Sequence, residues 1–172
     1  MALPDYRASA SARGMHFFAG DEFMREQLDV NPPYQRGLVW GVTRKRGLVK
    51  SLLMGIPVPS IVINDRSIRF EGWDAETDPF YVVVDGKQRI TAIRDFVDGK
   101  SAVPGHWFDV DADEVRFTEL GQPDRLHFMH RPVAVSEAKL ATLDEEREMF
   151  DLINFGGVAQ GDTDDDLLEG QS

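Results

Sequence analysis

The stretch YVVVDGKQRITAIRDF, residues 81–96, places a run of β-branched residues directly before a segment with helical periodicity. The three valines at 82–84 predict a strand covered on both faces, because a half-exposed strand would alternate apolar and polar residues. After Gly86, apolar side chains recur at the spacing of one helix face, which predicts a helix over residues 87–98. The stretch therefore predicts a junction at which a buried strand turns into a helix.

Turn residues and periodicity place further elements around this junction. They are a short helix within residues 20–30, a helix from Thr43 to about Met54, strands at 60–64 and 132–136, and a helix from Thr142 to about Asn154. Residues 101–128 are expected to be irregular. Strands that alternate with helices in this way predict a mixed α and β fold with few strands.

The length of 172 residues favours one domain. We expect residues 1–19 to be a flexible leader, residues 20–158 to form the domain and residues 159–172 to be an acidic disordered tail. The chain has no cysteine, which excludes disulfides and cysteine-ligated zinc. No apolar run approaches the length of a membrane span, so we expect no membrane association. The lack of cysteine does not fix the compartment, and a cytoplasmic location is the default expectation.

The net charge of −11 is unevenly distributed. From Glu137 to the end there are eleven acidic and two basic residues, so the preceding part is nearly neutral. Residues 30–64 carry five cations and no acid. Whole-chain charge therefore does not exclude a polyanionic partner.

The residues at the predicted junction suit an anionic ligand. The first N–H groups of a helix lack intrahelical partners and the helix dipole is positive there, so phosphate is a natural ligand. Gly86 would allow a sharp bend and a close approach of the backbone. Arg89 is expected to bind phosphate oxygens through two parallel hydrogen bonds, and Lys87 to add a point charge. Asp85 would cap the helix or orient a Mg²⁺ ion carried by a nucleotide.

The plain alternative is that the Asp-Gly pair only makes a turn. Asp85 would then cap the helix, while Lys87 and Arg89 would be solvated. From these residues alone both interpretations stay open, because short motifs often match by accident.

A second candidate site is the helix that follows PPYQR. Its cations are Arg44, Lys45, Arg46 and Lys50. Cations in a first helical turn oppose the dipole at a small cost, which a polyanion such as DNA would offset. Trp40 nearby offers an aromatic ring for stacking a base. The alternative is a solvated basic face that serves solubility.

Other titratable groups carry less information. His127 and His130 share a helix face, but without a third ligand we interpret them as structural and predict no metal site in the protein. No P-loop pattern occurs. Glu145 and Glu146 fit helix capping better than acid catalysis.

Four motifs in order, PPYQRGLVW, LVKSLLMGIPVPSIVI, VVVDGKQRITAIRDFVDGK and EREMFDLINFGG, resemble the N-terminal domain family of GmrSD-type restriction endonucleases. The resemblance covers about residues 28–158 and implies an α+β, ParB/sulfiredoxin-like fold, with a small mixed sheet flanked by helices. In that family the D-G-x-Q-R element is tied to binding and hydrolysis of a nucleoside triphosphate.

The resemblance assigns roles to particular positions. The nucleotide-binding positions are Gln35, Arg36, Asp85, Gly86, Lys87, Gln88, Arg89 and Asn154. Asp85, Gln88 and Arg89 would also serve in catalysis if the nucleotide is hydrolysed. Lys87 departs from the family, which often has Gln there, and Ile153 stands where Leu is usual.

The resemblance also frames the competing functions. The helical extension and the His-Asn-His nuclease domain of the full-length enzymes do not follow, so we expect this chain alone not to cut DNA. We expect a nucleotide-binding domain, and a possible NTPase, with a role in restriction or defence. The alternatives are a non-catalytic DNA-binding module and a regulatory fragment that binds a nuclease partner chain.

Overall fold

The computed structural model describes residues 3–35, 37 and 39–155. The strands are β1 (Ser9–Gly14), β2 (Leu28–Asp29), β3 (Ile61–Asp65), β4 (Tyr81–Asp85), β5 (Ala102–Pro104), β6 (Glu114–Arg116) and β7 (Pro132–Ala138). The helices are α1 (Met15–Ala19), α2 (Glu22–Glu26), α3 (Val42–Leu53), α4 (Arg66–Arg69), α5 (Lys87–Val97), α6 (Gln122–His130) and α7 (Leu143–Phe155). Single 3₁₀ turns lie at Gly105–Phe108 and Phe117–Glu119.

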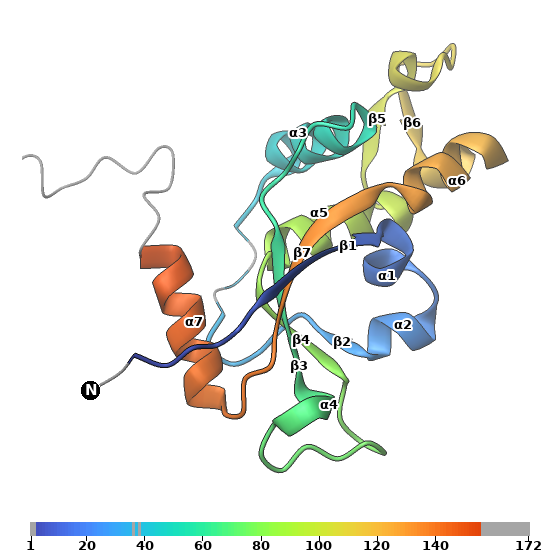
Figure 1. The fold of residues 1–172 in the computed structure, drawn as a ribbon. Coiled ribbons are helices and arrows are strands. Elements are labelled where there is room, and N and C mark those ends of the chain that lie inside the picture. Colours follow the sequence, from blue (N-terminus) through green and yellow to red (C-terminus); the bar gives the residue numbers. More distant parts are fainter. Residues whose placement is uncertain (1–2, 36, 38, 156–172) are drawn as a thin grey trace, which may run out of the picture.

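A five-stranded mixed sheet in the order β1-β7-β3-β4-β2 forms the centre of the fold (Figure 1). β1 and β7 pair antiparallel, as do β3 and β4, whereas β3 with β7 and β2 with β4 are parallel. β5 and β6 form a separate two-stranded sheet. The predicted α+β fold, a small mixed sheet flanked by helices, is confirmed.

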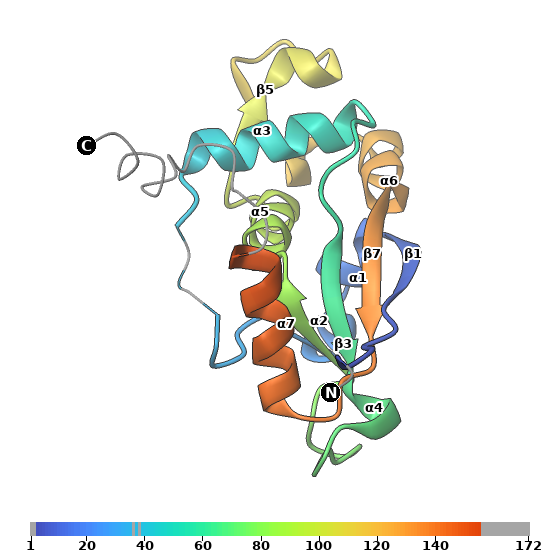
Figure 2. The ribbon, with the colours of Figure 1, turned by 60° about the vertical axis from the view of Figure 1, so that its left-hand side comes forward.

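Helices cover both faces of the sheet. Alternate residues of β3 point to opposite sides: Ile61 and Ile63 belong to a large apolar cluster with α1, α3, α5 and α6, whereas Val62 belongs to a smaller cluster with α7. Val83 and Val84 of β4 divide in the same way. α7 runs alongside β4 on the smaller cluster's side (Figure 2). The prediction that β4 is covered on both faces is confirmed.

The expectation of a flexible leader is wrong for residues 9–19. β1 pairs with β7 along its whole length, and Met15 and Phe18 of α1 are completely buried. β1 has small, mostly exposed residues, so its sequence lacks the alternation that marks a half-buried strand. Backbone pairing with β7, which local sequence does not reveal, holds it in the sheet.

Two other segments differ from the sequence predictions. Residues 101–128 are not irregular, since they contain β5, β6, two 3₁₀ turns and most of α6. Within residues 20–30 the helix is only α2, and β2 follows it. The predicted acidic tail lies outside the described residues.

Candidate functional site at the junction of β4 and α5

Gly86 forms the turn between β4 and α5 and is the N-cap of the helix. Its φ of +108° lies in the left-handed region, which L side chains rarely adopt. A Cβ atom here would also lie 3.0 Å from Cγ1 of Ile61 and 3.3 Å from Nη2 of Arg89. Both the backbone conformation and the close approach of neighbours therefore require glycine.

Arg89 lies one turn further along and is held against the junction. Its Nη2 donates to Oδ2 of Asp85 at 2.6 Å and to the carbonyl oxygen of Ser60 at 3.1 Å. The Arg89 side chain is only 14% exposed, and its Nε is buried without a hydrogen-bond partner in the described part of the chain. The guanidinium is thus fixed at the helix N-terminus rather than extended into solvent.

The Gln88 side chain contacts the loop between β2 and α3. Its Oε1 accepts from the backbone N–H groups of Val39 at 3.2 Å and Trp40 at 3.3 Å, and its Nε2 donates to the carbonyl of Gly37 at 2.9 Å. A side-chain amide that hydrogen-bonds to three backbone groups restrains the loop in the way that a neighbouring backbone segment would. The Gln88 amide, which the resemblance predicts to bind a nucleotide, is therefore hydrogen-bonded to the protein's own backbone.

Gln35 is used in a similar way at the other side of this loop. Its Nε2 donates to the carbonyl oxygens of Val83 and Val84, the second at 3.0 Å. The described residues between Asn31 and Trp40, which we name the junction loop, are therefore tied both to the end of β4 and to the start of α5. Arg36, which was also predicted to bind nucleotide, lies outside the described residues.

The remaining predicted nucleotide-binding residues divide between two places. Lys87 is the first residue of α5 and is partly exposed. Asn154 is exposed near the end of α7, and its Nδ2 donates to the carbonyl of Phe150 within the same helix at 2.8 Å. The structure thus brings residues 85–89 and Gln35 together at the junction. The Asn154 amide instead hydrogen-bonds within its own helix.

The cations of α3 each have a partner within the protein. Nζ of Lys45 lies 2.6 Å from Asp95, and Arg46 lies 2.5 Å from Glu114. The Arg44 guanidinium lies 4.6 Å from the ring centroid of Trp40, and Nζ of Lys50 lies 5.7 Å from that of Trp107. No acid lies near these cations in the sequence, but in the folded chain Asp95 of α5 and Glu114 of β6 lie beside two of them.

Sequence reasoning missed the role of Glu146. Thr142 caps α7, since its Oγ1 accepts from the N–H of Glu145 at 3.2 Å, and the Glu145 side chain takes part in the cap because its Oε2 accepts from the N–H of Ala141 at 2.6 Å. Glu146 instead is completely buried and binds Tyr34 of the junction loop. The local signal that it faces inward is its position three and four residues before Met149 and Phe150, which pack on the smaller cluster.

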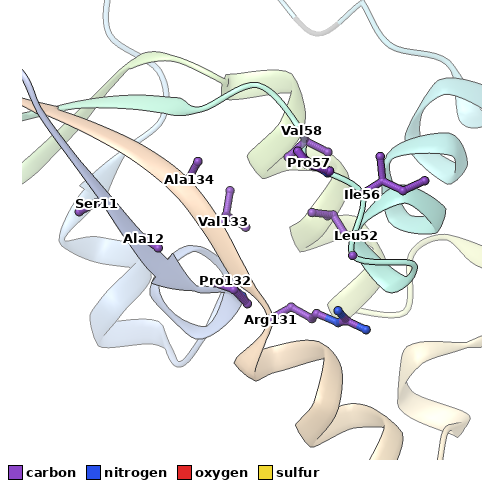
Figure 3. A pocket seen from close by; sticks show the side chains of 11 residues that line it. Ser11, Ala12, Leu52, Ile56, Pro57, Val58, Arg131, Pro132, Val133 and Ala134 are labelled. Atoms are coloured by element: carbon purple, nitrogen blue, oxygen red, sulfur yellow. The ribbon is translucent and has the colours of Figure 1, made fainter.

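A hollow of about 350 Å³ lies away from the junction, between the turn after α3 and strands β1 and β7. Its lining is mainly apolar and includes none of the junction residues. In Figure 3 the Arg131 guanidinium points away from the side chains of Val133 and Ala134. Nη2 of Arg131 donates to the carbonyl of Leu53 at 2.8 Å, so this cation caps the C-terminal end of α3.

The described residues offer neither a metal cluster nor a membrane-spanning helix. Within them, no group of three or more His, Cys, Asp or Glu residues is placed to hold a metal ion. None of the helices there has the length and apolar character needed to cross a membrane.

The fold and the junction define a class: a small α+β domain in which a left-handed glycine and a fixed Asp-Arg pair mark the start of a helix. A family model described as the N-terminal domain of the GmrSD restriction endonuclease matches residues 21–168. The chain belongs to this family. The comparison with curated proteins gave no match.

A solved structure similar to this chain is that of the C-terminally truncated chromosome-partitioning protein ParB from Caulobacter crescentus, complexed with CTP-γ-S. The TM-score is 0.44 and the identity 12%, over 88% of this chain and 55% of the ParB chain. This chain thus spans about half the length of that structure. At this level of similarity, the likeness assigns no role to any residue.

Proposed function

We propose that this domain binds a nucleoside triphosphate at the junction of β4 and α5. The observation that carries the proposal is the first turn of α5, which has two cations, Lys87 and Arg89, and no acid. Cations are unfavourable near the positive end of the helix dipole; Asp85 offsets part of this cost for Arg89, and a bound polyanion would reverse it. Gly86 has no side chain to cap the first amides or to obstruct a phosphate.

The ion pair of Arg89 with Asp85 leaves part of the guanidinium for a ligand. Both described hydrogen bonds use Nη2, and Nη1 makes none to another described residue. A guanidinium carries five donors in a planar fork, so Nη1 can meet a phosphate oxygen while Asp85 keeps the plane oriented. In this proposal Asp85 orients Arg89, and Arg89 contacts the phosphate.

The residues also fit a Mg²⁺ ion that arrives with the triphosphate. The Asp85 carboxylate is 25% exposed, and the ion pair uses only its Oδ2. Its other oxygen would bind the ion directly or through water, as single carboxylates often do in nucleotide sites. The ion would neutralise phosphate charge beside the carboxylate.

Hydrolysis is a second, separable part of the proposal. Because the Gln88 amide is hydrogen-bonded to the loop backbone, we propose that it holds the junction loop and does not orient an attacking water. Positioning and charge neutralisation by Arg89 and Mg²⁺ would then carry any catalysis. The name of the family supports a role in DNA restriction, with a nuclease chain as partner.

DNA binding by α3 is the second candidate, and it has less support. A phosphate backbone would have to displace Asp95 from Lys45 and Glu114 from Arg46. Arg44 beside Trp40 remains available for a backbone or base contact. If DNA binds here, its affinity falls steeply as salt is raised.

A thermal-shift panel tests the nucleotide site directly. The four ribonucleoside triphosphates are added with and without Mg²⁺, and binding to the native state raises the apparent Tm. At a ligand concentration of 100 times Kd, the stabilisation is about 2.7 kcal/mol. The variant Arg89→Gln should lose the shift, whereas the control Arg116→Gln, which removes a more exposed arginine paired with Glu119, should keep it. An equal shift in both variants rejects this site.

A further inference from the structure

The junction loop is joined to α7 by a buried polar cluster that neither the family nor the proposed function assigns. The Glu146 side chain is completely buried. Its Oε1 accepts from Nδ2 of Asn64 at 2.8 Å and from Nε of Arg66 at 2.9 Å. Its Oε2 accepts from Nη2 of Arg66 at 2.7 Å and from the hydroxyl of Tyr34 at 3.3 Å. Three elements therefore converge on one carboxylate: β3, the start of α4 and the junction loop.

Each partner fixes the carboxylate in a different direction. Arg66 binds it through two parallel hydrogen bonds, the arrangement that gives an arginine–carboxylate pair its geometric specificity. Asn64 is itself buried, and its Oδ1 accepts from the N–H of Leu140 at 2.7 Å, so the amide cannot turn away. The Glu146 carboxylate is thus held in a fixed position, in which it accepts a hydrogen bond from the Tyr34 hydroxyl.

Tyr34 remains a hydrogen-bond donor throughout the ordinary pH range. Burial, together with the nearby Glu146 charge, raises the pKa of the Tyr34 hydroxyl far above its usual value. The Tyr34 ring also packs on Phe150 of α7, with ring centroids 5.6 Å apart. One side chain of the junction loop therefore makes both a polar and an apolar contact with α7.

The residues after Tyr34 carry this attachment to the junction. Gln35 binds the carbonyls at the end of β4, and Gln88 binds the backbone of Gly37, Val39 and Trp40. The loop is consequently anchored to α7 at one end and to α5 at the other. With these restraints, a displacement of α7 would change the position of the loop relative to the junction of β4 and α5.

We infer that Tyr34 and Glu146 are positioning residues, through which α7 sets the placement of the junction loop and thereby the affinity of the junction for nucleotide. The second half of this inference rests on the proposed function, whereas the first half does not. Neither residue touches the phosphates in this arrangement. Their effect passes through the loop backbone.

The variant Tyr34→Phe tests the inference with a closely matched control. It removes the hydroxyl and keeps the ring that packs on Phe150. Tyr6→Phe is the control, because Tyr6 also donates to a glutamate of α7, Glu148, but lies in the segment before β1. Urea unfolding of both variants shows whether overall stability changes equally.

The first readout is amide hydrogen exchange without any nucleotide. The N–H groups of Val39 and Trp40 report the loop directly, since both donate to Gln88. Losing one hydrogen bond should raise their exchange rates about fivefold to tenfold in Tyr34→Phe, and leave them unchanged in Tyr6→Phe. Unchanged rates at both amides in Tyr34→Phe, or an equal rise in the two variants, would overturn the positioning role.

The second readout is the affinity for the triphosphate that wild-type protein binds in the thermal-shift panel. Tyr34→Phe should weaken it about fivefold to tenfold, a loss within the range expected for one hydrogen bond, and Tyr6→Phe should not. A loosened loop with unchanged affinity overturns the coupling to the site. If wild-type protein binds none of the nucleotides, the proposed function fails and the coupling fails with it, while the exchange readout still decides the positioning role.

Discussion

Arg89 and Asp85 form an ion pair across the first turn of α5, with Nη2 of the arginine 2.6 Å from Oδ2 of the aspartate. Asp85 is the last residue of β4, so the pair joins the end of the strand to the start of the helix. The carboxylate offsets the arginine charge where the helix dipole disfavours it. The same pair keeps the guanidinium plane in place for a ligand, and its two members should therefore have different effects on binding.

The first prediction separates these two effects. Arg89→Lys keeps the charge but loses the planar fork, and it should weaken triphosphate binding by about 1.5–3 kcal/mol, the range for hydrogen bonds to charged groups. Asp85→Asn removes a negative charge beside the phosphates but keeps an oxygen that can accept from Nη2 of Arg89, so binding without Mg²⁺ should be retained or strengthened. Calorimetry with and without Mg²⁺ measures both affinities.

Asp85→Asn should also reduce the gain in affinity that Mg²⁺ gives, because an amide is a poorer ligand for this hard cation than a carboxylate. If Mg²⁺ raises the affinity for triphosphate equally in the wild-type protein and in Asp85→Asn, Asp85 does not coordinate the ion. A loss of affinity in Asp85→Asn without Mg²⁺ would mean that a neutral acceptor does not hold the Arg89 guanidinium in place and that the charge of Asp85 is needed for this.

The second prediction concerns the stability of the junction. Gly86→Ala should lower the free energy of unfolding by about 2–4 kcal/mol, because a left-handed conformation costs roughly 1–2 kcal/mol and the new methyl crowds Ile61. Gly72→Ala is the control, since its φ of +76° is also left-handed but no described atom lies within 4 Å of the position that its methyl group would take. The difference between the two variants in urea unfolding isolates the contribution of crowding.

Local signals account for the parts of the fold that the sequence predicted well. The valines of β4, the glycine after them and the apolar periodicity of α5 all lie within one short stretch, and each acts through its immediate neighbours. The junction and its charged residues were therefore visible in the sequence. The orientation of Arg89 toward the Ser60 carbonyl was not, because that contact depends on how β3 lies beside β4.

The features that the sequence did not reveal share a different physical cause. β1 is held by β7, and Ser9 pairs with Glu137 from the far end of the chain. The cations of α3 looked unopposed because Asp95 and Glu114, their partners, are distant in sequence. The hydrogen bonds of the Gln88 amide to Gly37 and Val39 likewise join segments that are far apart along the chain. Each of these is a long-range contact that composition and periodicity do not encode.

The third prediction tests the two functions of the Gln88 amide. Gln88→Glu keeps an acceptor for the N–H groups of Val39 and Trp40 but loses the donor to Gly37, whereas Gln88→Ala loses both. Amide exchange at Val39 and Trp40 should accordingly rise more in Gln88→Ala. Affinity for triphosphate should fall in both, by about 0.5–1.5 kcal/mol for each net hydrogen bond lost from the loop.

Gln88→Glu carries an additional effect, since its new negative charge lies close to the proposed phosphates. Its binding should weaken further at low ionic strength and partly recover as salt screens the repulsion. If both variants keep protected loop amides and wild-type affinity, the amide of Gln88 does not hold the loop in solution.

The last prediction concerns the pH dependence of stability. Hydrogen bonding from Arg25 holds the pKa of the Asp98 carboxyl below its usual value of 3.8, against the opposing effect of burial. Nη2 of Arg25 lies 2.7 Å from Oδ1 of Asp98, so the pair ties α2 to the end of α5. Because the pKa is lower in the folded state, this group stabilises the protein fully above the unfolded pKa. The contribution is lost as pH falls through the lower, folded pKa.

Asp98→Asn should therefore be less stable than the wild-type protein at pH 7, and the gap should narrow below a pH of about 3.8. Urea unfolding of both proteins across this range measures the gap in the free energy of unfolding. A gap that stays constant with pH would show that Arg25 does not stabilise the Asp98 charge, because only a charge that the folded state stabilises makes the difference depend on protonation.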